Sequence, residues 1–159
     1  MSRTATARSG SDHPGIEASP RRECSVAAAL DVIGEKWSLL VVRELLFGVD
    51  TFNEIAARTG APRDILTARL RRLEELGVIE RHAYSERPLR HRYALTAKGR
   101  DLRPVMMTLK HWGDTHVMGT VMPPVYEHSC GAVFEPQIEC AACEQTVQPR
   151  SLTRTDVHP

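Results

Sequence analysis

Apolar residues recur at helical spacing along residues 24–47. Val26, Leu30 and Ile33 lie on one side of a first helix, and Gly34 interrupts the pattern. From Trp37 onward the helical pattern resumes, with apolar residues on nearly every side, which is typical of a central core helix. We therefore expect two helices separated at Gly34, or one bent helix, with Gly48 ending the second in a left-handed conformation.

Capping and breaking residues mark the next two helices. Thr51 and Glu54 fit a capping box at the start of a short helix that stops at Thr59 and Gly60. Pro62 suits the first turn of a longer helix, which Gly77 ends.

The longer helix has two distinct faces. Leu66, Leu70 and Leu73 form a narrow apolar stripe. The opposite face carries Asp64, Thr67, Ala68 and Arg71. A capped short helix, a glycine turn and a longer helix with one stripe are typical of a helix-turn-helix.

Residues 78–85 and 89–95 are predicted to form two strands joined by a turn at 86–88. The second strand alternates, with Leu89, His91, Tyr93 and Leu95 on one face and Arg90, Arg92 and Ala94 on the other. A hairpin directly after a helix-turn-helix is a wing. Its tip and outer face carry Arg87, Arg90 and Arg92.

A last helix is expected over residues 97–118, capped by Thr96. Pro104 would cost about 3 kcal/mol in a helix interior, so the helix should kink or break there. Its apolar stripe is longer than the small core needs and comprises Leu102, Val105, Met106, Leu109, Trp112 and Val117. We assign the surplus to a dimer interface; the alternative is a helix folded back on its own domain.

The predicted fold class is α+β and mainly helical, a winged helix-turn-helix domain with terminal dimerisation helices. Residues 1–22 are rich in Ser, Thr, Ala, Arg and Pro and should be a disordered arm. Residues 23–119 form the domain, and 120–159 a tail that contains Cys and His.

The net charge of +1 hides a local asymmetry. Residues 58–103 hold twelve Lys and Arg against six Asp and Glu, whereas both flanks are acidic. A basic segment that coincides with a helix-turn-helix indicates an anionic partner, double-stranded DNA. No apolar run approaches the ~20 residues of a membrane span, and we expect a cytoplasmic protein with no membrane partner.

Residues 24–118 contain four sequence motifs in succession, followed by Trp112-Gly113. The motifs are CSVAAALDVIGEKWSLLVVRELL from Cys24, FNEI from Phe52, LTARLRRLEELGVI from Leu66 and YALTAKG from Tyr93. Together they resemble the HxlR-type winged helix-turn-helix transcriptional regulators. This resemblance implies a homodimer in which terminal helices pair, and regulation of neighbouring genes.

The exposed face of the helix at 63–76 would read base edges in the major groove. The candidate residues are Arg63, Asp64, Thr67 and Arg71. The wing arginines, Arg87, Arg90 and Arg92, would contact phosphates or reach into the minor groove. A dimer places two reading helices about 34–36 Å apart, so the operator should be a rough inverted repeat, whether for repression or activation.

The tail carries a possible zinc site. Its candidate ligands are His128, Cys130, Cys140 and Cys143, a set that could form a tetrahedral Cys₃His centre. The spacing departs from a zinc ribbon, since the first pair is His-x-Cys and Glu144 replaces a usual glycine. A redox pair or disulfide, or free thiols, are the alternatives, so no cofactor is required.

Cys24 lies at the start of the first helix, where the helix dipole favours a reactive thiolate. It is a candidate redox or electrophile sensor; otherwise it is a small residue buried at a dimer interface. A small-molecule effector is also open, since Trp37 and Trp112 could line a pocket, although both suit a core.

Two other functions are weaker. An enzyme lacks support, because no phosphate loop, catalytic triad or H-E-x-x-H signature is present. A winged-helix protein adaptor without DNA binding does not explain the basic middle segment.

Overall fold

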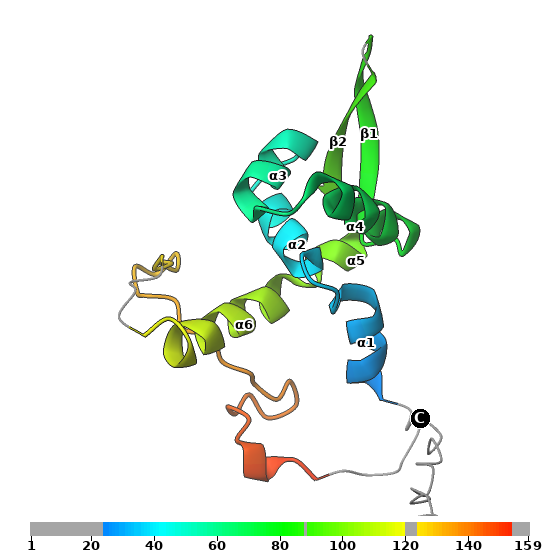
Figure 1. Ribbon diagram of the computed structural model, residues 1–159. Helices are drawn as coiled ribbons and strands as arrows, with labels where there is room; N and C mark the ends of the chain where they lie inside the picture. The colour runs from blue at the N-terminus through cyan, green and yellow to red at the C-terminus, as the bar shows by residue number, and fades with distance from the viewer. Residues whose placement is uncertain (1–23, 88, 120–123, 154–159) are drawn as a thin grey trace, which may run out of the picture.

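The computed structural model describes residues 24–87, 89–119 and 124–153, so the predicted N-terminal arm lies outside the described residues. The elements run in the order α1 Ser25–Ile33, α2 Ser38–Leu46, α3 Phe52–Thr59, α4 Arg63–Glu75, β1 Ile79–Glu86, β2 Leu89–Leu95, α5 Ala97–Arg100, α6 Arg103–His116 and the 3₁₀ helix η1 Pro149–Ser151 (Figure 1). The chain forms a helical helix-turn-helix domain with a two-stranded antiparallel wing, as predicted.

Helix α2 lies at the centre of the core. Val41 and Val42 are fully buried, and α3, α4, β2 and α6 all pack against α2. The stripe predicted for α4 is confirmed, because Leu66, Leu70 and Leu73 are buried. The rest of this buried cluster is supplied by Ile55, Ala61, Val78, Ile79, Leu95 and Met106.

Two predicted helix starts differ in detail. Thr51 precedes α3, but its hydroxyl donates to Glu54 Oε2 at 2.5 Å and accepts no backbone N–H, so the capping box does not form. Pro62 precedes α4 with an extended ψ of 141°, and α4 begins at Arg63. The carbonyl of Pro62 accepts from the Leu66 N–H at 2.8 Å, so proline still opens the hydrogen-bond series.

The predicted last helix is divided into α5 and α6. Thr96 caps α5 by accepting from the Gly99 N–H at 3.2 Å, and α6 starts with Pro104 in its first turn, where proline is tolerated. Gly99 is a close-packing position, since a Cβ there would lie 2.1 Å from the carbonyl oxygen of Val78. The break predicted from Pro104 is confirmed.

The wing is anchored on one side by the loop before α3. Thr51 forms an isolated antiparallel bridge with Arg92, and the Tyr93 N–H donates to the Asp50 carbonyl at 2.8 Å. The hairpin itself has a register irregularity between Ala83 and Ser85. The sequence pattern did not predict the bridge by which Thr51 adds a short third backbone segment to the edge of the wing.

After α6 the described chain continues as residues 124–153, which belong to the predicted C-terminal tail. From here on we call residues 124–153 the arm; the N-terminal segment predicted for residues 1–22 is not meant by this name. The arm is mostly extended and exposed, with isolated bridges between Glu127 and Val133 and between Glu139 and Thr146. In Figure 1 it descends from beside α6 to η1, at the opposite end of the molecule from the wing. No helix in the described parts is long and apolar enough to cross a membrane.

Candidate nucleic-acid interface

Helix α4 presents a polar face to solvent. Its apolar stripe anchors it to α2 and the wing, and this burial turns Asp64, Thr67 and Arg71 outward, where all three are exposed. Thr67 Oγ1 donates to the Arg63 carbonyl at 2.8 Å, which leaves the oxygen lone pairs and the methyl group available. The predicted division of α4 into two faces is therefore confirmed.

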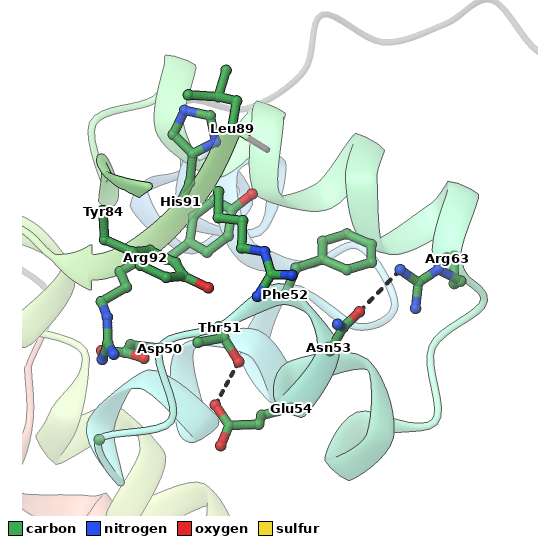
Figure 2. A pocket seen from close by; sticks show the side chains of 13 residues that line it. Asp50, Thr51, Phe52, Asn53, Glu54, Arg63, Tyr84, Leu89, His91 and Arg92 are labelled. Atoms are coloured by element: carbon green, nitrogen blue, oxygen red, sulfur yellow. Dashed lines mark hydrogen bonds and ion pairs between the residues drawn. The ribbon is translucent and has the colours of Figure 1, made fainter. Parts of the chain in front are cut away.

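Arg63, the first residue of α4, is held by side chains from α3. Its Nη2 donates to Asn53 Oδ1 at 3.0 Å, and its guanidinium carbon lies 4.7 Å from the centre of the Phe52 ring (Figure 2). A stacked and hydrogen-bonded guanidinium loses less conformational freedom when it binds a base edge or phosphate. Sequence reasoning missed these two orienting residues, although the FNEI run contains both.

Arg71 lies further along α4 and is more loosely held. Its Nε donates to Glu75 Oε1 at 3.0 Å across one helical turn, and the side chain remains 81% exposed. Such exposed pairs contribute about 0.3–0.5 kcal/mol, so a phosphate can compete with Glu75 for this guanidinium.

The two outward arginines of β2 differ. Arg92 Nη1 donates to Asp50 Oδ2 at 2.7 Å, and its guanidinium lies 5.1 Å from the centre of the Tyr84 ring (Figure 2). The hydrogen bond and charge of Asp50 raise the pKa of Arg92. The Arg90 side chain is exposed and has no hydrogen-bond or ion-pair partner among the described residues. Arg92 therefore ties the wing to the loop before α3, whereas Arg90 is available.

A hollow of about 770 Å³ separates α3 from the wing. Three of the predicted residues line it, namely Arg63, Arg90 and Arg92. Figure 2 shows Arg63 and Arg92 there, together with the acidic Asp50 and Glu54. Arg71 and Arg87 do not line this hollow; Arg87 is exposed beside the turn of the wing. The structure thus gathers cations from α4 and the wing on the side where α3 begins.

The sequence profile of the HxlR-like helix-turn-helix family matches residues 32–120. The chain belongs to the HxlR-like family. MT3179 of Mycobacterium tuberculosis, an HTH-type transcriptional regulator, is 41% identical over 131 residues, covering 81% of this chain and 83% of the relative. This HxlR-like protein is accordingly a DNA-binding transcription regulator.

Solved structures extend the comparison. PA1607, a proposed transcription factor, has a TM-score of 0.75 and 30% identity, with 86% of this chain and 97% of that chain covered. The redox regulator HypR in its oxidised form has a TM-score of 0.51 and 34% identity, with 58% of this chain and 97% of HypR covered.

The predicted zinc ligands of the HxlR-like protein lie in two turns of the arm. His128 Nδ1 is 3.2 Å from Cys130 Sγ, and the Cys143 N–H donates to the Cys140 carbonyl at 3.3 Å. The residue after each pair is left-handed, with φ of 86° at Gly131 and 56° at Glu144. In the described arm and domain no three metal-ligating side chains cluster, so the structure shows two pairs and not one set of four.

The thiols have different settings. Backbone N–H groups of Ala142 and Cys143, with the Cys143 side chain, lower the pKa of Cys140. Cys24 is exposed at the residue before α1. The two tryptophans also differ, since Trp37 packs against the core and Trp112 is 56% exposed on α6.

Proposed function

We propose that this regulator binds a specific sequence of double-stranded DNA as a homodimer, with α4 in the major groove and the wing on the flanking backbone. The observation that carries the proposal is the exposed polar face of α4, which begins at the oriented Arg63 and continues through Thr67. Depending on where the operator lies, the same binding represses or activates transcription.

The roles follow from the geometry of the side chains. A guanidinium fork matches the two acceptors of guanine, and a threonine suits a base, a phosphate or the thymine methyl. Arg63 and Thr67 are therefore the proposed base-reading pair, with Asp64 and Arg71 beside them. Arg90 and Arg87 on the wing are the proposed phosphate contacts, and Arg92 mainly positions the wing through Asp50.

The second copy is inferred from unpartnered apolar surface on α6 and α1. On α6 the outward side chains of Val105, Leu109 and Trp112 are 46%, 46% and 56% exposed. On α1, Val26 and Leu30 are 67% and 55% exposed. Met106 packs in the core, so α6 serves its own domain with one face and offers the other for dimerisation. Two α4 helices one DNA turn apart would read an inverted repeat.

The experiment is selection of duplexes from a random pool, followed by titration of the selected sequence. We expect a selected site with two related half-sites in inverted orientation. Sedimentation should give a dimer for the wild type and a monomer for Leu109→Glu. Ala97→Glu, at an exposed position of α5, adds the same single negative charge and is the control. Selection of half-sites in direct repeat, or a monomeric wild type, contradicts the dimer.

A thiol response is a separate proposal. Cys24 is exposed beside α1, whose apolar residues belong to the proposed dimer contact, and the related HypR is a redox regulator. Adding an electrophile there would change a surface that sets DNA affinity. DNA titration before and after treatment with a mild thiol oxidant tests it. If the oxidant changes the DNA affinity of Cys24→Ser as much as that of the wild type, Cys24 is not the sensor.

A further inference from the structure

A second hollow, of about 560 Å³, lies between α2, α3, α6 and the start of the arm. Its volume falls in the range typical of small-molecule sites. The apolar and aromatic residues that line it are Leu46, Phe47, Met106, Met107, Met118, Pro124 and Tyr126. We call this hollow the α2–α6 pocket.

The charged residues of the α2–α6 pocket leave positive charge in excess. Four cations and two carboxylates line it, and both carboxylates are already paired. Glu44 accepts from Arg43 Nε at 2.7 Å, and Asp114 pairs with Lys110. The side chains of Arg58 in α3 and Arg103 in α6 have no ion-pair or hydrogen-bond partner within residues 24–87, 89–119 and 124–153.

The pocket also contains polar groups that packing holds in place. The Glu44 side chain is only 4% exposed, and a carboxylate this buried requires the guanidinium that pairs with it. An apolar lining with a few convergent polar groups is the usual composition of a ligand site.

The arm closes one side of the pocket. The Tyr126 ring stacks on Phe47 with ring centres 6.2 Å apart and planes inclined by 16°. Lys110 Nζ lies 5.2 Å from the centre of the Tyr126 ring, a cation–π contact. The stacked Phe47 and Tyr126 rings both line the pocket and together give it an aromatic wall against which a planar ligand can pack.

We propose that the α2–α6 pocket binds a small amphipathic organic anion, an aromatic carboxylate. Its ring would lie against Met106 and Tyr126, and its carboxylate would pair with Arg58 and Arg103. Two guanidiniums match a carboxylate in charge and in hydrogen-bonding geometry.

The pocket and the proposed dimer contact use different faces of α6. The pocket takes residues at helical spacing, namely Arg103, Met106, Met107, Lys110 and Asp114. Val105, Leu109 and Trp112 point to solvent. A ligand and a second copy can therefore bind together.

An effector role rests on the proposed DNA-binding function. Arg58 belongs to α3, the first helix of the helix-turn-helix, and Arg103 belongs to the helix proposed for dimerisation. A carboxylate that bridges them changes the position of the reading domain relative to its partner, and hence the DNA affinity.

Calorimetry of the full chain with 1-naphthoate and with the neutral 1-naphthamide tests the site. We expect saturable binding of one naphthoate per chain, with the amide about tenfold weaker because it lacks the charge. The double variant Arg58→Gln, Arg103→Gln should lose about tenfold in naphthoate affinity, and the lysine pair at the same positions should retain part of it.

The double variant Arg72→Gln, Arg150→Gln removes two positive charges from exposed positions outside the pocket, so it is the matched charge control and should bind like the wild type. No saturable binding, equal binding of acid and amide, or an equal loss in the control overturns the site. DNA titration without ligand tests the proposed function separately. Wild-type DNA affinity that is unchanged by saturating naphthoate overturns the effector role alone.

Discussion

The winged domain and the arm of this protein are held together by different forces. In the domain, residues such as Val41 and Leu66 are fully buried around α2. In the arm, Val125, Val133 and Ile138 are 64%, 62% and 65% exposed. The described residues of the arm form two isolated β-bridges in place of a regular strand pair. The domain is therefore stabilised by apolar burial, whereas the arm needs a metal, a ligand or a second chain to gain comparable stability.

Truncation of a core leucine should show the contrast most strongly. Leu66→Ala removes a fully buried side chain and should lower the free energy of unfolding by about 2–5 kcal/mol. Ile138→Ala in the arm should leave it unchanged within about 0.5 kcal/mol. Urea unfolding followed by circular dichroism measures both. Equal losses would show that arm and domain unfold as one unit.

A glycine pair gives the next largest effect. A Cβ at Gly99 meets the Val78 carbonyl oxygen, so Gly99→Ala should destabilise the domain by about 1–3 kcal/mol. Gly131 in the arm has φ of 86°, and its substitution by alanine should strain only the local turn. Thermal unfolding should therefore shift for Gly99→Ala alone. A matching shift for Gly131→Ala contradicts the separation of the two regions.

Loss of a wing arginine should weaken DNA binding moderately. Arg90→Ala removes a proposed phosphate contact and should reduce affinity similarly for all sequences, with the salt slope smaller by about one. Arg150 in the arm is the control, since η1 lies at the opposite end of the molecule from the wing (Figure 1). DNA titrations of the wild type, Arg90→Ala and Arg150→Ala at several salt concentrations measure the affinity and its salt slope. An unchanged slope for Arg90→Ala removes its phosphate role.

Zinc should affect the arm and leave the domain almost unchanged. If His128, Cys130, Cys140 and Cys143 bind zinc, the two turns must come together or meet those of a second copy. Reduced protein should then contain zinc, and a chelator should make the arm more sensitive to protease without shifting the unfolding of the domain. Reduced protein without zinc contradicts this prediction.

Local patterns predicted the domain well. The stripe of Leu66, Leu70 and Leu73, the glycine breaks and the effect of Pro104 depend on neighbours within a few residues, and the structure confirms each. The capping box failed because two conformations of the same side chains compete. The Thr51 hydroxyl donates to the Glu54 carboxylate, so neither side chain accepts a hydrogen bond from a backbone N–H at the start of α3.

The candidate site was only partly predictable. The exposed face of α4 follows from helical periodicity, but the Arg92–Asp50 pair joins residues 42 positions apart. The α2–α6 pocket collects side chains from four segments, and no local pattern marks Arg58 or Arg103. Such contacts depend on how α3, α6 and the arm pack around α2, which residue spacing does not encode.

The most direct test of DNA reading by α4 is one anisotropy titration with the selected duplex and a scrambled duplex of equal length and composition. Wild-type protein should bind the selected duplex at least about 10³-fold more tightly at physiological salt. Thr67→Ala and Arg63→Ala should each reduce the difference in binding free energy between the two duplexes by about 1–3 kcal/mol. Equal wild-type affinity for both duplexes, or a ratio that neither substitution changes, contradicts base reading by α4.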